Sequence, residues 1–271
     1  MAGFSSSPLI DVSQLQRQLA EVAHVFTLET IDTCPSTNTL LLDQAETGAP
    51  SGKVVIADRQ TAGRGSRGRQ WQASPEASLT FSLLWRFGDD LEKLTGLSLV
   101  VGLAVVRALE SLGAKDIGLK WPNDILHGGR KLGGILVELH TEARAAGAVI
   151  GIGLNLAMPP AFDTTSAIAL VPTALTEVLP QRPERVVVLA AVLRELAGSL
   201  PEFVRDGLAP FLADWQRCNV WRDQTVNLVR DGQTLAQGVC RGIDRDGALL
   251  VEMDGRVERF LSGDLSIRAV A

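Results

Sequence analysis

The spacing of hydrophobic residues divides the chain into two parts. Through about residue 218, stretches with apolar residues at helical spacing alternate with short apolar runs, which predicts helices interleaved with strands. The expected helices cover 11–23, a segment that Ser36 opens, 91–112, 184–199 and 201–217, the last two separated by Pro201. The expected strands cover 25–31, 53–58, 78–86, 117–121 and 149–156, with a hairpin over 124–139 turning at Gly128 and Gly129, and a loop over 157–172.

From about residue 219 the pattern changes to short alternating segments separated by turn residues. Asp-Gly pairs at 231–232, 246–247 and 254–255 are typical of tight hairpins between antiparallel strands. We therefore predict two domains, residues 1–218 and residues 219–271, the second being a small antiparallel β-barrel.

Composition narrows the classes of function. The chain has 271 residues, of which 46% are hydrophobic and 21% charged, so it can bury a large core. A net charge of −5 argues against nucleic-acid binding by the protein as a whole. The three cysteines form no Cys-x-x-Cys pair, which argues against a disulfide framework or a thiolate zinc site. No secretory signal pattern and no apolar run of membrane-spanning length occur, so we expect a cytoplasmic protein with no membrane partner.

The segment 59–71 is rich in glycine and arginine. It carries four arginines and no acidic residue. Guanidinium groups suit carboxylate and phosphate oxygens, and glycines let a ligand approach the backbone closely. The composition predicts a loop that closes over an anionic substrate, although it fits a solvated basic surface loop equally well. An RNA-contacting patch is a third alternative, which the acidic character of the whole chain weakens.

Three further segments carry candidate chemistry. Lys120 to Asp124 joins two predicted strands, and a carboxylate there could hold Mg²⁺, receive a proton or only form an ordinary turn. Lys131 stands between two glycine pairs, where it could reach a phosphate or carboxylate or simply be exposed. The glycines of 151–153 lie in a buried-looking strand, which indicates close packing or backbone contact with a ligand.

Taken in order, these motifs resemble the biotin–protein ligase family. The resemblance covers about residues 28–271, and 241–250 resembles that family's small SH3-like domain. It is carried by Ser36-Thr37-Asn38, Gln60-Thr61-Ala62-Gly63-Arg64-Gly65, Arg67-Gly68-Arg69, Trp71, Lys120-Trp121-Pro122-Asn123-Asp124, Arg130-Lys131-Leu132-Gly133-Gly134-Ile135-Leu136-Val137-Glu138 and Gly153-Leu154-Asn155. The implied fold is α+β: a mixed-sheet catalytic domain of the biotin/lipoate ligase type, followed by an SH3-like β-barrel. About 35 residues precede Ser36, so we expect a catalytic-only form without an N-terminal DNA-binding domain.

The resemblance also implies roles for individual residues. Catalytic roles fall on Lys131, Arg64, Lys120 and Asp124. Biotin contacts fall on Ser36, Thr37, Asn38, Gln60, Arg64, Gly65, Ser66, Lys131 and Gly133. Nucleotide contacts fall on Arg67, Arg69, Trp71, Asn123 and Asn155. No metal ligand is assigned, and Phe162 is the only aromatic residue of 157–172, where some relatives pack one on adenine.

The implied reaction consumes ATP and biotin, with Mg²⁺ as cofactor. It forms biotinyl-5′-AMP and then transfers biotin to a lysine of a biotin carboxyl carrier protein. No DNA partner is expected, and a homodimer is an open alternative to a monomer.

Three other functions remain as alternatives. A lipoate ligase or octanoyltransferase shares the architecture, although the Lys-Trp-Pro-Asn-Asp motif beside the glycine–arginine loop argues against it. A nucleic-acid-binding module would use 59–71 and bind with strong salt dependence. A degenerate biotin binder would have lost its chemistry, yet Lys131 and Asp124 are both retained.

Ser66 is where the loop departs from the resemblance, because well-known members carry an arginine there, at a position that helps retain the activated intermediate. We expect Ser66→Arg to lengthen the half-life of bound biotinyl-adenylate, since a guanidinium adds a partner for its phosphate. The decay of the bound intermediate without carrier protein measures this. Equal half-lives for the native protein and the variant would contradict the expectation.

Overall fold

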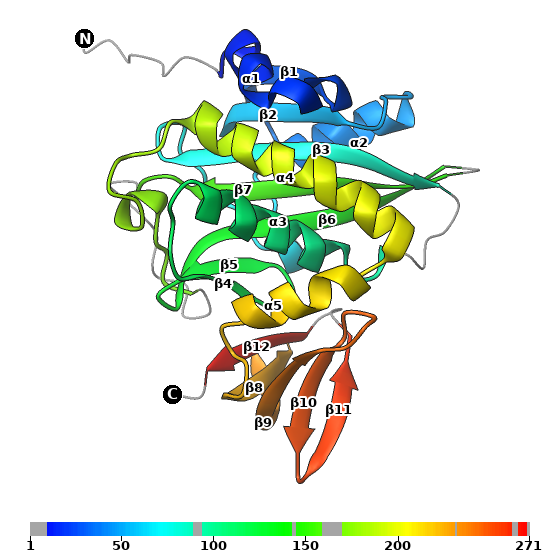
Figure 1. The fold of residues 1–271 in the computed structure, drawn as a ribbon, viewed down its shortest axis with the longest axis vertical. Coiled ribbons are helices and arrows are strands. Elements are labelled where there is room, and N and C mark those ends of the chain that lie inside the picture. Colours follow the sequence, from blue (N-terminus) through cyan, green and yellow to red (C-terminus); the bar gives the residue numbers. More distant parts are fainter. Residues whose placement is uncertain are drawn as a thin grey trace.

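A computed structural model describes residues 10–88, 94–142, 145–158, 170–230, 232–261 and 265–269. Its larger sheet has the strand order β1-β2-β3-β7-β6-β5-β4 (Figure 1). Only β1 and β2 are parallel, so the sheet is mixed, as expected. The strands are β1 (Thr27–Cys34), β2 (Lys53–Gln60), β3 (Ser78–Gly88), β4 (Ile117–Lys120), β5 (Asp124–His127), β6 (Arg130–Glu142) and β7 (Ala145–Asn155).

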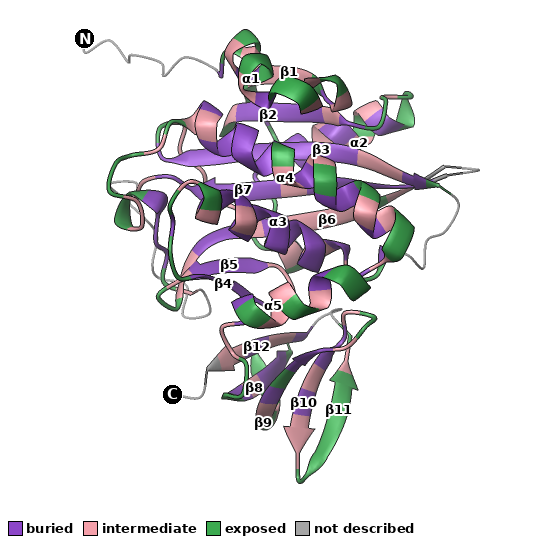
Figure 2. Cartoon of the chain, viewed as in Figure 1, coloured by how far each residue is buried: buried purple, intermediate pink, exposed green. Residues whose placement is uncertain are grey.

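Helices cover both faces of this sheet. In Figure 1, α3 and α4 cross in front of the sheet and α2 lies behind it. The helices are α1 (Val12–Leu19), α2 (Thr37–Glu46), α3 (Leu97–Ser111), α4 (Arg185–Asp206) and α5 (Leu212–Cys218), with 3₁₀ turns η1 (Ala20–Val25), η2 (Ser66–Gly68), η4 (Leu175–Glu177) and η5 (Ala209–Phe211). Burial is concentrated in the central strands and on the inner sides of α3 and α4 (Figure 2).

Side-chain alternation along the strands builds the two apolar layers. Ile56 and Leu83 belong to the main core under α3 and α4, whereas their neighbours Val55 and Leu84 pack with α2 in a second cluster. Successive residues of a strand point to opposite faces, so a central strand that is covered on both sides is apolar almost throughout. This explains the unbroken apolar run that predicted a buried strand at 53–58.

The sheet face that α2 partly covers carries small and polar residues on the half that α2 leaves uncovered. Thr80 and Ser82 of β3 pair with Gly153 and Gly151 of β7, and Gly153 in turn pairs with Gly134 of β6. Directly paired residues of antiparallel strands point to the same face. The uncovered half of this face is therefore built from small residues, which leaves room above the sheet.

The helical region near the C-terminal end of the larger domain corrects one prediction. Pro201 does not separate two helices; it lies inside α4, which runs from Arg185 to Asp206. A proline inside a helix removes one backbone hydrogen bond, but the buried side chains of Leu196, Leu200 and Phe203 hold the helix against the core. The helix ends at Gly207 instead, where the backbone turns to φ +67°.

The other predicted helices and strands are present in the structure, but some begin or end at different residues. Ser36 caps α2 by accepting a hydrogen bond from the Thr39 N–H, and the hairpin between β5 and β6 turns at Gly128 and Gly129, both with positive φ. The helix expected over 91–112 begins at Leu97. Most of the loop predicted over 157–172, including Phe162, lies outside the described residues.

The remainder of the chain forms an antiparallel sheet of order β11-β10-β9-β8-β12, below α5 in Figure 1. Its strands are β8 (Thr225–Arg230), β9 (Gln233–Ile243), β10 (Leu249–Met253), β11 (Arg256–Phe260) and β12 (Leu265–Ala269). Gly247 and Gly255 turn with φ of +80° and +73°, as the Asp-Gly pairs predicted. The fold is SH3-like, but among the described residues β11 and β12 do not pair to close a barrel.

Partly buried hydrogen bonds join the two sheets. Trp121 Nε1 donates to the Gly247 carbonyl at 3.1 Å, and Gln216 Nε2 donates to the Ile243 carbonyl at 3.3 Å. A Cβ at Gly247 would lie 3.1 Å from Leu99 of α3, so the turn packs closely on the larger domain. The smaller sheet is thus fixed against the edge of the larger one.

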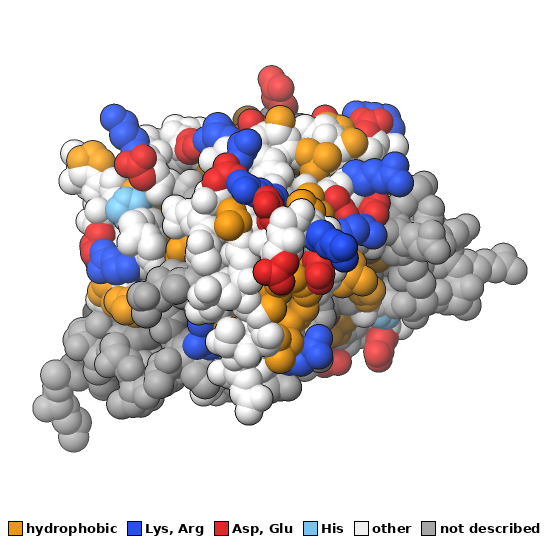
Figure 3. All heavy atoms as spheres, turned by 90° about the horizontal axis from the view of Figure 1, so that it is seen from below, with side chains coloured by type: hydrophobic (Ala, Val, Ile, Leu, Met, Phe, Trp, Pro, Cys, Tyr) orange, Lys and Arg blue, Asp and Glu red, His pale blue; other side chains and the backbone are white. Residues whose placement is uncertain are grey.

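Charge is mixed over the end of the molecule formed by the smaller sheet. Figure 3 looks at this end and shows acidic and basic side chains interspersed, with apolar side chains between them. A nucleic-acid-binding face would carry clustered basic residues. In the described part of the chain, no helix is long and apolar enough to cross a membrane.

Replacing Pro201 with alanine should raise the free energy of unfolding by about 1–2 kcal/mol, because alanine restores a backbone donor inside the helix and removes the clash of the ring with the preceding turn. Urea unfolding measures the change. The neighbouring Glu202→Ala, which alters no backbone donor, should shift stability by less than about 0.5 kcal/mol. A less stable Pro201→Ala protein would contradict this account of α4.

Candidate functional site

A cavity of about 670 Å³ opens over the small residues of the larger sheet. Its wall includes the N-terminus of α2, the end of β2, the glycine–arginine loop, the β4–β5 connection and the end of β7. The smaller sheet contributes as well, through Ser266, Ile267 and Arg268 of β12. Segments from both domains therefore meet at one hollow.

At one end of the cavity, uncharged polar groups form a connected network. Gln60 Oε1 accepts from the Thr37 N–H at 2.8 Å and lies 3.3 Å from the Thr37 hydroxyl. Ser82 Oγ lies 2.7 Å from Thr37 Oγ1 and 2.5 Å from Asn38 Oδ1. Asn38 approaches the sheet closely, since a Cβ at Gly151 would lie 2.2 Å from its Oδ1. This end suits a neutral ligand group that both donates and accepts hydrogen bonds.

The glycine–arginine loop is folded back on itself. The Gly65 N–H donates to the Arg69 carbonyl at 2.7 Å, and the Trp71 N–H donates to the Gly63 carbonyl at 2.9 Å. A Cβ at Gly63 would lie 2.5 Å from the Trp71 carbonyl, which explains the glycine there. Within the loop, Arg69 Nη2 donates to Ser66 Oγ at 2.9 Å.

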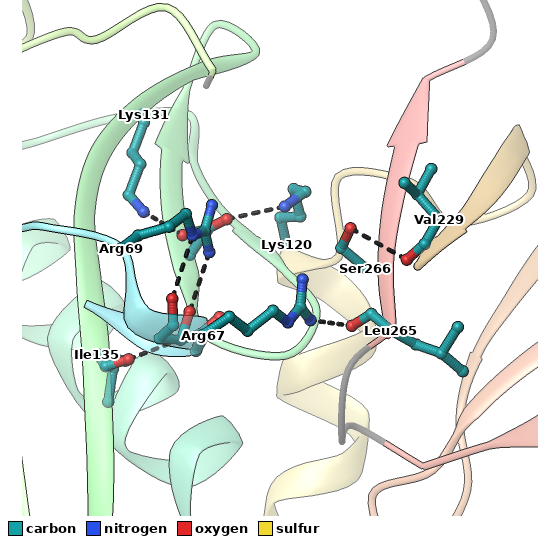
Figure 4. Close-up of polar contacts among 11 residues, drawn as sticks. Arg67, Arg69, Lys120, Lys131, Ile135, Val229, Leu265 and Ser266 are labelled. Atoms are coloured by element: carbon teal, nitrogen blue, oxygen red, sulfur yellow. Dashed lines mark hydrogen bonds and ion pairs between the residues drawn. The ribbon is translucent and has the colours of Figure 1, made fainter. Parts of the chain in front are cut away.

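Two arginines tie the loop to other parts of the chain. Arg64 Nη2 pairs with Glu138 Oε1 of β6 at 2.6 Å. Arg67, itself at φ +61°, reaches across the cavity and donates to the Leu265 carbonyl of β12 (Figure 4). The loop therefore bridges the two domains above the sheet.

The centre of the site is a carboxylate between two ammonium groups. Asp124 Oδ2 lies 2.8 Å from Lys120 Nζ, and its Oδ1 lies 2.5 Å from Lys131 Nζ (Figure 4). The short β4–β5 connection and the register of the β5–β6 hairpin bring the three side chains together. The side chains of Lys120 and Asp124 are only 9% and 5% exposed, whereas that of Lys131 is 24% exposed, so Lys131 is the group open to a ligand.

The protonation of this cluster follows from burial and charge. Burial alone would raise the pKa of Asp124, but the Lys131 and Lys120 ammonium groups outweigh it and hold that pKa well below its usual range. Burial lowers the pKa of Lys120, against the opposing effect of Asp124. With both lysines protonated, the ionised Asp124 leaves one positive charge in excess.

Trp71 covers part of the sheet beside this cluster. A Cβ at Gly153 would lie 2.4 Å from Cε2 of Trp71, so the indole rests on the glycine backbone. Lys131 Nζ lies 5.8 Å from the centroid of the Trp71 ring, within range of a cation–π contact. The indole Nε1–H is buried and has no hydrogen-bond partner among the residues that the structure describes.

Asn123 and Asn155 use their amides on the backbone around Lys131. Asn123 Nδ2 donates to the Ile135 carbonyl at 2.8 Å, and Asn155 Nδ2 donates to the Thr173 carbonyl at 3.0 Å. Lys131 is also held through its backbone, which pairs with Val171 and Thr173. Both asparagines fix the strand from which Lys131 projects.

The structure brings nearly all the residues singled out from sequence to this cavity. Those that line it are Ser36, Thr37, Asn38, Gln60, Arg64, Gly65, Ser66, Arg67, Arg69, Trp71, Lys120, Asn123, Asp124, Lys131 and Asn155. Gly133 is placed elsewhere: a Cβ there would lie 2.6 Å from the Leu154 side chain, and the neighbouring Gly134 faces the cavity instead. The side-chain alternation of β6 explains why these two neighbours face opposite sides of the sheet.

Sequence reasoning missed two groups that belong to the site. Trp221 and Arg268 come from the smaller domain, and no local pattern links them to segments some hundred residues away. Thr80 and Ser82 were hidden in a strand that was expected only as apolar structure. Their alternation of polar and apolar residues was the available signal.

Among the described residues that line the cavity, six side chains are cationic and one is a carboxylate. The cations are Arg64, Arg67, Arg69, Lys120, Lys131 and Arg268, and the carboxylate is Asp124. Such an excess of charge favours an anionic ligand. The part of the chain that the structure describes contains no cluster of three or more His, Cys, Asp or Glu side chains that could hold a metal ion.

Two family models match the chain. Residues 30–155 match the Biotin/lipoate A/B protein ligase family, and residues 223–268 match the Biotin protein ligase C terminal domain. The bifunctional ligase/repressor BirA of Escherichia coli is 36% identical over 96% of this chain and 79% of that protein. The biotin--[acetyl-CoA-carboxylase] ligase of Mycobacterium tuberculosis is 33% identical over 95% of this chain and 96% of that protein.

Solved structures resemble the chain over most of its length. The biotin protein ligase of Aquifex aeolicus, in complex with biotin and ATP, superposes with a TM-score of 0.77 at 29% identity, covering 90% of this chain and 99% of that one. Its apo structure superposes with a TM-score of 0.74 at 27% identity, covering 90% and 100%.

Replacing Asp124 with asparagine should lower the free energy of unfolding by about 3–5 kcal/mol at pH 7, because it leaves two close ammonium groups uncompensated, one of them buried. A depressed pKa contributes stability above the unfolded value of about 4 and loses it as pH falls, so the deficit should narrow below pH 4. Urea unfolding at pH 7 and pH 3 measures both effects.

The matched control is Asp214→Asn, which removes a carboxylate that is 41% exposed from a surface pair with Arg107. It should cost less than about 1 kcal/mol. A deficit for Asp124→Asn that is equally small, or that does not change with pH, would show that the cluster is not the buried ion network described above.

Proposed function

This chain belongs to the biotin/lipoate A/B protein ligase family, and on that premise we propose that its cavity joins biotin to ATP and then passes biotin to a carrier lysine. The chain is thus a ligase of the biotin--[acetyl-CoA-carboxylase] type. The product of the first half-reaction is biotinyl-5′-AMP, and the acceptor in the second is a biotin carboxyl carrier protein.

The observation that carries the proposal is the charge of the cavity wall, with six cations against one carboxylate. Both reactants of the first step are anions, a carboxylate and a triphosphate, and they repel each other in water. Preorganised cations lower that repulsion and stabilise the charge that develops on the phosphate in the transition state.

We assign biotin to the end of the cavity with the neutral network. Its uncharged ring system would contact Ser36, Thr37, Asn38 and Gln60, and its carboxylate would point toward Lys131. Arg64, Gly65 and Ser66 would cover it from the loop. The arrangement supports this because neutral donors and acceptors lie at one end and ammonium groups at the other.

In the first step, a biotin carboxylate oxygen bonds to the α-phosphorus of ATP as the bond to pyrophosphate breaks. Lys131 is the more exposed ammonium of the central cluster and would offset the growing negative charge. Both oxygens of Asp124 are engaged by lysines, so we assign it to placing Lys120 and Lys131. In the second step, a carrier lysine amine attacks the acyl carbon of the adenylate, and AMP leaves.

Nucleotide binding is assigned to the remaining residues of the wall. Arg67 and Arg69 would meet the phosphates, and Trp71 offers an indole face and an unpartnered Nε1–H. Asn123 and Asn155 would act by holding the backbone near Lys131.

Mg²⁺ would accompany ATP. The described residues do not fit a metal cage made by the protein, since they hold no cluster of ligating side chains and both oxygens of Asp124 are taken. Magnesium commonly keeps several waters and binds through substrate phosphates.

The proposal also covers the domain boundary, the oligomeric state and the cellular location of the protein. We place the domain boundary between residues 218 and 219, since α5 ends at Cys218 and β8 begins at Thr225. A homodimer would use the β6 edge, which β5 pairs only up to Gly134. The three cysteines are free and buried, which supports a reducing location such as the cytoplasm.

The first test is biotin-dependent exchange of labelled pyrophosphate into ATP, which needs no carrier protein. We expect exchange with biotin and none with lipoate or octanoate, the substrates of the main alternative. Absence of biotin-dependent exchange from folded protein with Mg²⁺ and ATP would refute the proposed adenylation.

Lys131→Ala should lower the exchange rate by about 100-fold or more, the usual cost of removing a preorganised group that stabilises transition-state charge. The fold should survive, since Asp124 keeps its pair with Lys120. Lys115, which is exposed and lies outside the cavity wall, provides the control in Lys115→Ala. Normal exchange by folded Lys131→Ala would remove the lysine from the mechanism.

A further inference from the structure

Glu138 stands just outside the cavity and contacts two of the groups that form its wall. One carboxylate oxygen pairs with Arg64 of the glycine–arginine loop at 2.6 Å, and the other accepts from Asn38 Nδ2 at 2.9 Å. The Glu138 side chain is 20% exposed and does not itself line the cavity. Its position on β6 pairs with Val149, on the face that carries α2.

The contact with Glu138 decides which way the Asn38 amide points. A carboxylate can only accept hydrogen bonds, so Asn38 must turn its NH₂ toward Glu138 and its oxygen toward Ser82. The same NH₂ lies 3.3 Å from the Leu136 carbonyl, which is a second acceptor. Asn38 is only 3% exposed, so no bulk water competes for these positions.

The orientation of the Asn38 amide determines how the Ser82 and Thr37 hydroxyl groups donate their protons. Ser82 has one hydroxyl proton and two acceptors in reach, Asn38 Oδ1 at 2.5 Å and Thr37 Oγ1 at 2.7 Å. While Asn38 presents its oxygen, that proton is drawn to Asn38, so the Thr37 hydroxyl donates its own proton to Ser82 and faces the cavity as an acceptor. If Asn38 turned over, Ser82 would donate to Thr37, and the pattern at the cavity wall would change.

We propose that Glu138 is a positioning residue for biotin: its carboxylate sets the donor and acceptor pattern of the Asn38, Ser82 and Thr37 chain and holds Arg64 over the same pocket. This rests on the proposed function, because it takes biotin as the ligand of that end. The urea-like ring of biotin has one acceptor oxygen and two N–H donors, so it is sensitive to a reversed pattern.

The test compares Glu138→Gln with the native protein in the exchange assay and in calorimetric titration with biotin. The amide keeps the size of the side chain but removes its charge and adds a donor facing Arg64 or Asn38. The Kd and KM for biotin should rise about tenfold, the size of losing one charge-assisted hydrogen bond, with kcat changed less than about threefold. Glu138→Asp should recover part of the loss, since the charge remains.

Glu29→Gln is the matched control. Glu29 also binds one cation, Lys53 at 2.7 Å, and one amide, Gln44, but it lies on β1, away from the cavity. It should leave biotin affinity unchanged. An equal loss in both variants, or a Glu138→Gln protein within twofold of native affinity, would overturn the proposal.

Ser82→Ala tests the chain itself. If Glu138 acts through Ser82, the double variant should bind biotin about as weakly as the weaker single variant. Losses that multiply would overturn the relay. Native protein without biotin-dependent exchange would instead refute the proposed function, a result independent of either variant.

Discussion

The site depends on a sheet that is covered on both faces but not completely. Helices α3 and α4 pack on the main core of one face, while α2 covers part of the other. Beyond the part of this face that α2 covers, the strands carry glycines and small hydroxyl residues in place of Val55, Leu84 and Val149. A sheet normally buries its apolar face against another layer. The glycines and hydroxyl residues of this half of the face have no large apolar side chains, so no helix has to cover them. The cavity therefore exists because small residues alternate along the strands on this face of the sheet, and not because of the shape of a loop.

Polar and charged side chains surround these small residues of the sheet. Neutral amide and hydroxyl groups lie near α2, the Lys120, Asp124 and Lys131 cluster lies at the β4–β5 connection, and the loop adds three arginines, of which Arg64 lies beside α2. Asp124 allows two ammonium groups to stand close together in a buried place, which their mutual repulsion would otherwise oppose. The smaller sheet completes the wall, and Arg67 links the loop to it.

Much of this could be predicted from sequence, and the limits have physical causes. Ser36 as a helix cap and the Gly128-Gly129 turn are local features, so local patterns found them. Pro201 was misjudged because burial of its neighbours outweighs the local penalty. Gly133 was assigned to biotin from the resemblance, whereas the cavity is lined by Gly134, because the alternation of β6 decides which of the two faces it. Arg268 and Trp221 escaped notice because their role arises from the docking of two domains.

The glycines of β7 have a consequence for how such a protein changes over evolutionary time. Asn38 and Trp71 lie directly above Gly151 and Gly153 because no Cβ is present, and almost any mutation there would push these side chains into the cavity without adding atoms to the core. A lineage released from selection would tend to fill its pocket before it lost its fold. Its descendants would be well-folded, inactive relatives, whose past activity could still be inferred from their intact cores.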